Sequence, residues 1–114
     1  MNIQTEAVHT AEFLLSEGNR EISREAITVA AGDALPAGQV LGIQTASGHY
    51  AAYSPAATDG TEVAVGILHA ALPTSADVRN GVAFVRLAEV AAARLTGLDA
   101  AAIADLKTRH LIVR

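Results

Sequence analysis

The sequence predicts one mainly β domain of the α+β class, with short helices near the C-terminus and a flexible arm at the N-terminus. In the middle of the chain, apolar residues alternate with a period of two between turns rich in Gly, Pro and Asp, which is typical of strands. After Arg86 the apolar spacing changes to about 3.6 residues, which favours helices. The first 19 residues show neither pattern clearly. We therefore expect an arm over residues 1–19 and a β domain over residues 20–114.

The arm is mostly polar and carries one apolar cluster, Phe13-Leu14-Leu15. Val8, Ala11 and Leu15 roughly follow a helical stripe, so a short helix is an alternative to an extended arm. Terminal segments that are not tied into a core are usually mobile, which favours the arm. The apolar cluster has two interpretations. It contributes to the core of its own domain, or it anchors the arm on another protein.

The residue pattern predicts three strands in the first half of the β domain. Ile27 and Val29 alternate with polar or small neighbours, as in a half-buried strand. A turn-rich segment, residues 32–38, precedes a second strand, and Ser47-Gly48 forms the tip of a hairpin turn. Pro55 ends the third strand, because proline cannot donate a hydrogen bond to a β-ladder. The second and third strands are expected at Val40–Ile43 and at residues 49–53.

Two further strands are expected after the loop that contains Asp59-Gly60. In the segment from Val63 to Leu68, Val63, Val65 and Ile67 share one face of the strand. Gly66 in the middle of this strand indicates a bulge or a close approach of another backbone. The polar segment from residue 73 to residue 81 is a loop in this interpretation. The last strand of this part is expected at residues 82–86.

The residue pattern predicts two helices and a terminal strand in the C-terminal part of the chain. The first helix is indicated by apolar residues spaced along one side, with Gly97 at its C-terminal end. Asp99 is a favourable N-cap for a second short helix that reaches Lys107, with Ile103 and Leu106 facing inward. Residues 110–113 are expected to form a strand. The apolar residues of the first predicted helix are Leu87, Val90, Ala91 and Leu95.

Composition limits the size of the core and the kinds of partner. Hydrophobic residues make up 51% of the chain but aromatic residues only 4%, so small side chains build a thin core and association with other copies or partners is expected. The net charge is -4 and the eight Lys and Arg residues are scattered, so nucleic acid is not an expected partner. The N-terminus has no basic region like that of a signal peptide, and no apolar run approaches the roughly 20 residues of a membrane span. The chain is expected to be soluble and not exported.

The sequence holds no catalytic or metal-binding motif. The four histidines, at positions 9, 49, 69 and 110, lack the spacing of metal ligands. Ser54, His49 and Asp59 have the residue types of a catalytic triad, but no nucleophile motif surrounds the serine, and such residues commonly form turns. We expect no enzymatic activity, no metal and no cofactor. The alternative is a small ligand-binding or enzymatic domain that uses the loop from Tyr50 to Asp59 together with His69.

Five segments, in this order, resemble the head decoration proteins of tailed bacteriophages, the lambda-type family. They are FLLSE, AGDALPAGQVLG, the unit from Asp59-Gly60 to VGIL, RLAEV and LIVR. The resemblance covers nearly the whole chain. It implies a β-clip-like domain that trimerises and binds the major capsid protein at three-fold and quasi-three-fold sites of the expanded head. It further implies a non-enzymatic stabilising role on the outer surface of the virion, after synthesis in the bacterial host cytoplasm.

The resemblance implies that the arm faces the capsid and that the apolar cluster anchors the arm on it. The lambda-like relatives have a longer polar arm with prolines, whereas this N-terminus has none. Two modes therefore stay open: the arm adds a strand to the capsid protein, or it only packs on it. The capsid-binding residues expected on this basis are Phe13, Leu14, Leu15, Ser16, Arg20 and Arg24.

Overall fold

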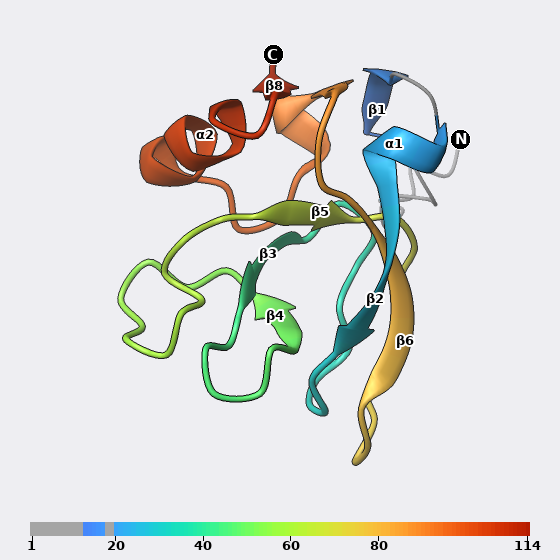
Figure 1. The fold of residues 1–114 in the computed structure, drawn as a ribbon, viewed down its shortest axis with the longest axis vertical. Coiled ribbons are helices and arrows are strands. Elements are labelled where there is room, and N and C mark those ends of the chain that lie inside the picture. The colour runs from blue at the N-terminus through green and yellow to red at the C-terminus, as the bar shows by residue number, and fades with distance from the viewer. Residues whose placement is uncertain (1–12, 18–19) are drawn as a thin grey trace, which may run out of the picture.

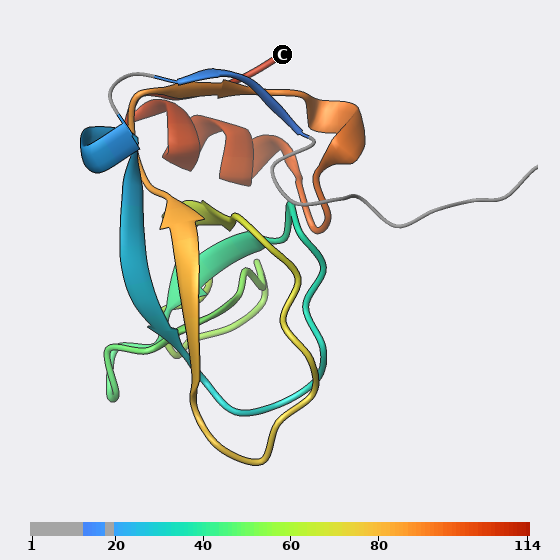
Figure 2. The same cartoon turned by 90° about the vertical axis from the view of Figure 1, so that its right-hand side faces the viewer.

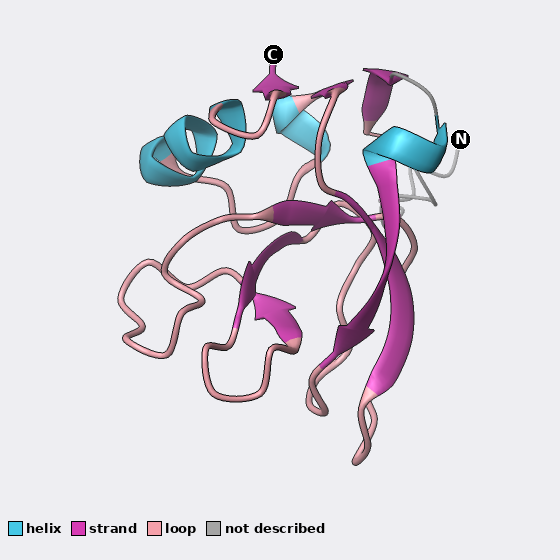
Figure 3. Cartoon of the chain, in the orientation of Figure 1, coloured by secondary structure: helices cyan, strands magenta, loops and turns pink. Residues whose placement is uncertain are grey.

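The computed structural model describes residues 13–17 and 20–114 (Figure 1). Residues 1–12, which hold most of the expected arm, lie outside the described part, as do the side chains of Arg20 and Glu21. The chain folds into a mainly β domain, as the sequence predicts (Figure 3). Its elements are β1 (Leu14–Glu17), α1 (Arg20–Ser23), β2 (Arg24–Val29), β3 (Val40–Ile43), β4 (Tyr50–Ala52), β5 (Gly66–Leu68), β6 (Arg79–Phe84), β7 (Ala88–Val90), the 3-10 helix η1 (Ala92–Arg94), α2 (Ala100–Lys107) and β8 (Leu111–Val113).

Five strands close into a small barrel in the order β2-β4-β3-β5-β6. The longest pairing is the antiparallel one between β2 and β6, which runs from Arg24 opposite Phe84 to Val29 opposite Arg79. Strands β3 and β4 form the predicted hairpin. A single parallel pair between Val29 and Tyr50 closes the barrel.

The other three strands form a separate sheet in the order β1-β7-β8, with β7 antiparallel to β1 and parallel to β8. Helix α2 lies between this sheet and the barrel (Figure 2). We call the sheet β1-β7-β8 together with α2 the cap. The opposite end of the barrel carries two long loops, residues 30–35 and 72–78, which we call the tip (Figure 1).

Strands β3 and β5 are buried on both faces, which explains their apolar sequences, and β6 is buried at its C-terminal end. One set of their side chains packs inside the barrel with Ile27 and Val29 of β2. The alternate set packs against the cap, around Phe13, Leu106 and Leu111. The inner set is Leu41, Leu68 and Ala83, and the set that faces the cap is Val40, Ile67 and Phe84. The barrel and the cap therefore share one layer of strands.

The structure confirms several local predictions. Strand β3 has the predicted bounds, and Gly48 in the hairpin turn has a φ of 75°, which glycine adopts without strain. A Cβ added at Gly66 would lie 3.1 Å from the carbonyl oxygen of Phe84, so this glycine marks the expected close approach of backbones. Asp99 caps α2 by accepting a hydrogen bond from the amide of Ala102.

Other predictions are wrong. The expected helix after Arg86 is instead strand β7 followed by η1, because residues 88–90 pair with β1 and β8, two segments that are distant in the sequence. In α2, Leu106 faces the core as expected, but Ile103 is 39% exposed and Ala102 is buried in its place. Strand β6 begins at Arg79, earlier than expected, and Val63 is exposed ahead of the shorter strand β5.

Arg79 explains why β6 extends toward the tip. Its guanidinium is buried and donates hydrogen bonds to the carbonyl oxygens of Ala30, Asp33 and Pro73, at 2.7 to 3.2 Å. Isolated bridges between Gly32 and Ser75, and between Leu35 and Leu72, join the same two loops. One buried cation thus holds the tip together.

Candidate functional site

The predicted capsid-binding cluster divides between the core and the surface. Phe13 is fully buried and meets Phe84 edge-to-face, with ring centroids 5.4 Å apart and planes at 85°. Leu14 is half-buried and packs on the same core. Leu15 is 54% exposed and Ser16 is exposed beside it. The described part of the arm, residues 13–17, is therefore fixed to the cap by Phe13 and presents Leu15 outward.

Arg24, another predicted capsid-binding residue, is engaged within the domain. Its guanidinium donates to both carboxylate oxygens of Glu17, at 2.7 and 3.2 Å, and lies 5.0 Å from the ring centre of Phe84. The hydroxyl of Ser23 donates to the same carboxylate at 2.5 Å, and His69 Nε2 lies 3.3 Å from Arg24. This cluster holds the end of β1 against the barrel. Arg20 begins α1, and its side chain lies outside the described part.

The outer face of the cap sheet is mixed in character. Glu89 of β7 lies in register between Ser16 of β1 and Ile112 of β8. An exposed ion pair joins Glu89 to Arg114, with 3.1 Å between Nε and Oε2. Next to this row, a shallow hollow of about 370 Å³ lies where the three strands come together. It is lined by Ser16, Glu17, Leu87, Ala88, Glu89, His110 and Ile112.

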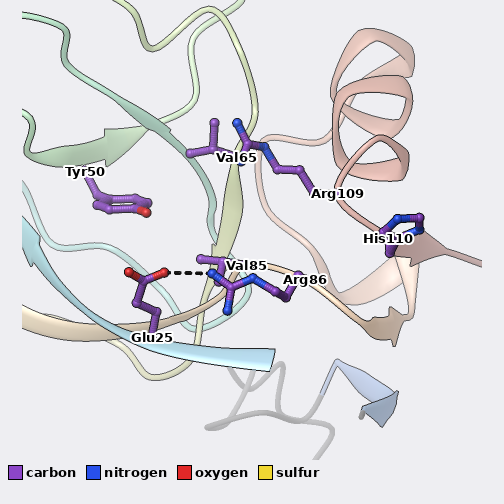
Figure 4. A pocket seen from close by; sticks show the side chains of 7 residues that line it. All are labelled: Glu25, Tyr50, Val65, Val85, Arg86, Arg109 and His110. Carbon is purple, nitrogen blue, oxygen red and sulfur yellow. Dashed lines mark hydrogen bonds and ion pairs between the residues drawn. The ribbon is translucent and has the colours of Figure 1, made fainter. Parts of the chain in front are cut away.

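A second pocket, of about 300 Å³, lies between the barrel wall and the end of α2 (Figure 4). The buried side chains of Val65 and Val85 form part of its lining. Arg86 donates to Glu25 Oε2 at 3.2 Å and to the carbonyl of Ile22, whereas the Arg109 guanidinium has no hydrogen bond or ion pair with any described residue. Figure 4 shows the guanidinium groups of Arg86 and Arg109 facing this pocket from two different connecting segments.

Tyr50 lines the same pocket, and the charged groups of the pocket influence the pKa of its phenol. Burial raises the pKa of the Tyr50 phenol above its usual value, and the nearby carboxylate of Glu25 raises it further. Arg109 and Arg86 act in the opposite direction. The pocket therefore combines a half-buried phenol with cationic groups, an arrangement that can bind an anion.

The alternative catalytic site does not assemble. Asp59 is used locally: its carboxylate accepts hydrogen bonds from the hydroxyl and the amide of Thr61, which lower the pKa of Asp59. His69 packs on Phe84 beside Arg24, in the cluster that holds β1, and His49 and Asp59 do not line the pocket of Figure 4. Among the described residues, no group of three His, Asp or Glu side chains could hold a metal ion.

No described helix has the length and apolar character needed to cross a membrane. Sequence reasoning singled out Leu15 and Ser16 of the cap but missed three residues that lie just before β7 and β8, namely Leu87, Arg109 and His110. The sequence contains a pattern that could have identified them: in both RLAEV and RHLIV, an arginine stands two residues before a strand.

Comparison with known families gives one clear result. The family model described as "Bacteriophage lambda head decoration protein D" matches residues 3–111, which is nearly the whole chain. No curated protein matches the chain at a significant level. The matched residues include all barrel strands and most of the cap, from β1 to the first residue of β8.

Proposed function

The chain belongs to the family of bacteriophage lambda head decoration protein D, a family of structural proteins of the phage head, and from this we propose that it stabilises the expanded head by binding the major capsid protein as a homotrimer. The match over residues 3–111 is the observation that carries this proposal. In this role the protein acts at three-fold and quasi-three-fold sites on the outer surface of the virion. It turns over no substrate and requires neither nucleic acid nor a membrane.

The surface proposed to face the shell is the cap. Within the described part of the chain, strand β1 lies at the edge of the cap sheet and pairs with β7, so its other edge is where a strand of the capsid protein would pair. Leu15 and Ser16 are the exposed residues of this edge. In this proposal Phe13 and Arg24 do not touch the shell directly. They hold β1 in place, Phe13 through the core and Arg24 through Glu17.

A trimer suits this role for two physical reasons. A three-fold assembly matches a three-fold position on the shell by symmetry, with head-to-tail contacts that close into a ring. Three arms on one rigid body make the second and third docking events intramolecular, so weak single contacts sum to a long-lived attachment. Exposed apolar side chains away from the cap, such as Val82 and Val63, are available for contacts between copies.

Co-sedimentation with expanded heads of the cognate phage, together with native mass spectrometry of the free protein, tests this proposal. We expect a trimer in solution and saturable binding to expanded heads. A strictly monomeric chain that does not bind heads would contradict the proposal. A truncation that removes residues 1–11 keeps Phe13 and should leave the trimer folded while it weakens binding, because the core contacts of the cap stay intact.

A further inference from the structure

Two similar corners lie side by side where the cap sheet begins. Strands β7 and β8 pair in parallel with Ala88 opposite Leu111. Because of this register, the residues before each strand, Leu87 and His110, occupy equivalent positions. Each follows an arginine, Arg86 or Arg109. The two segments 86–87 and 109–110 are distant in the sequence but adjacent in space, and we call them the double corner.

Both corners have strained backbones. Leu87 has a φ of 54° and His110 a φ of 60°, and in the described part of the chain these are the two non-glycine residues with positive φ. Glycine or asparagine adopts this conformation at lower cost than leucine does. The Leu87 side chain is 42% exposed, so it offers little packing in return for the strain. Strain of this kind in a surface residue is typical of a functional site.

The double corner lies between the two pockets described above. Leu87 and His110 line the hollow on the outer face of the cap, and Arg86 and Arg109 line the pocket of Figure 4. Arg86 is already paired with Glu25, whereas the guanidinium of Arg109 has no ion pair with a described residue. An exposed apolar side chain in one pocket and a cation available to a carboxylate in the other are thus connected through His110, which lines both pockets.

We propose that the double corner docks a segment of the capsid protein that presents a carboxylate to Arg109 and an apolar side chain to Leu87. This inference rests on the proposed function. The capsid protein is favoured over a second copy because the hollow that contains Leu87 and His110 is also lined by Ser16 and Glu17 of β1. The double corner is therefore continuous with the root of the arm, on the side proposed to face the shell.

The substitution Leu87→Gly separates a folding role from a docking role. Glycine relieves the strained φ at this position, so the variant should be at least as stable as the wild type. If the Leu87 side chain contacts the shell, the same variant should bind expanded heads about tenfold more weakly or worse. Val78→Ala is the matched control, because Val78 is 53% exposed at the tip, on the opposite end of the molecule.

The substitution Arg109→Glu tests the carboxylate. Repulsion of the incoming anion should weaken head binding by at least the same factor and should reduce the salt dependence of the binding. Lys107→Glu is its control, since it changes the net charge equally at a residue that lines neither pocket. All variants are compared as intact protein by co-sedimentation, thermal unfolding and native mass spectrometry.

The outcomes are distinct. The proposal predicts that Leu87→Gly and Arg109→Glu lose affinity for heads, with unchanged trimer mass and undiminished melting temperature, while both controls bind like the wild type. Wild-type affinity in both test variants would overturn it. A change of oligomeric state in the test variants would assign the double corner to a second copy and would also overturn it. If the wild-type protein itself ignores heads, the proposed function fails, and this inference fails with it.

Discussion

The barrel and the cap differ in where their structure is encoded. The barrel strands show local apolar alternation and the β3-β4 hairpin joins neighbouring segments, although the longest barrel pairing, β2 with β6, joins distant ones. The cap sheet is formed by β1, β7 and β8, which come from the start, the last third and the end of the described chain. Local patterns therefore describe the barrel well and the cap poorly.

The two regions also differ in the surface that they present. The barrel encloses a core of buried apolar side chains, while several outward residues of β2 are exposed. The cap carries the edge strand β1, the exposed Leu15 and the strained double corner. A stable barrel can hold a small cap, which is the surface proposed here to contact a partner. The substitutions below test how strongly the two regions depend on each other.

The largest expected effect follows from Phe13→Ala, which empties the centre of the core between barrel and cap. Large-to-small changes at a fully buried phenylalanine cost about 3–5 kcal/mol. We expect a loss of this size in the free energy of unfolding, measured by urea denaturation. Leu15→Ala, two residues away on the exposed side, is the control and should change stability by less than about 0.5 kcal/mol. Equal effects of the two substitutions would show that β1 is not docked as described.

A smaller but local effect is expected at the tip. Arg79→Met leaves the carbonyl oxygens of Ala30, Asp33 and Pro73 without their buried donor, at a cost of about 2–3 kcal/mol. Hydrogen exchange should become faster in the tip loops while the cap amides stay protected. Arg114→Met is the control, because its ion pair with Glu89 is exposed and contributes little. Loosening of the cap in Arg79→Met would contradict the independence of the two ends.

Much of the barrel could be predicted from the sequence, since β2, β3 and β4 each show a local pattern and end at recognisable turns. The cap could not. Leu87, Val90, Ala91 and Leu95 satisfy a helical spacing, yet strand pairing with β1 and β8 determines the backbone of residues 88–90. A helix is further opposed by the positive φ of Leu87.

The same reason limits prediction of the candidate site. The sequence singled out Phe13-Leu14-Leu15 as unusual, and the structure gives Phe13 to the core, in line with one of the two interpretations of that cluster. The predicted role of these residues in capsid binding stays a prediction. The double corner depends on the parallel register of β7 and β8, which no local spacing reveals.

A third substitution tests the connection between barrel and cap at α2. The Asp99 carboxylate caps α2 and also accepts hydrogen bonds from the Tyr53 hydroxyl of the barrel, at 2.9 and 3.1 Å. Asp99→Ala should lower stability by about 1 kcal/mol through loss of the cap. Asp99→Asn keeps an acceptor at the helix N-terminus and should lose less. Thermal unfolding of the two variants measures the difference, and identical losses would contradict the capping role.

The smallest expected effect depends on pH and lies in the barrel loop. The pKa of Asp59 is lowered by hydrogen bonds from Thr61, so the stability that this carboxylate contributes is present above its unfolded pKa of about 3.9 and is lost as the pH falls through the lower folded value. The stability advantage of the wild type over Asp59→Asn should therefore shrink as the solution is acidified. A constant difference across that acidic range would contradict the assigned hydrogen bonds.

The most direct test of the proposed role is an electron cryo-microscopy map of expanded heads of the cognate phage incubated with the protein. We expect trimeric density at the three-fold and quasi-three-fold positions, with β1 and the double corner against the shell and the tip pointing away from it. Density in which the tip contacts the shell, or heads that retain none of the protein, would contradict the assignment of the cap as the docking surface.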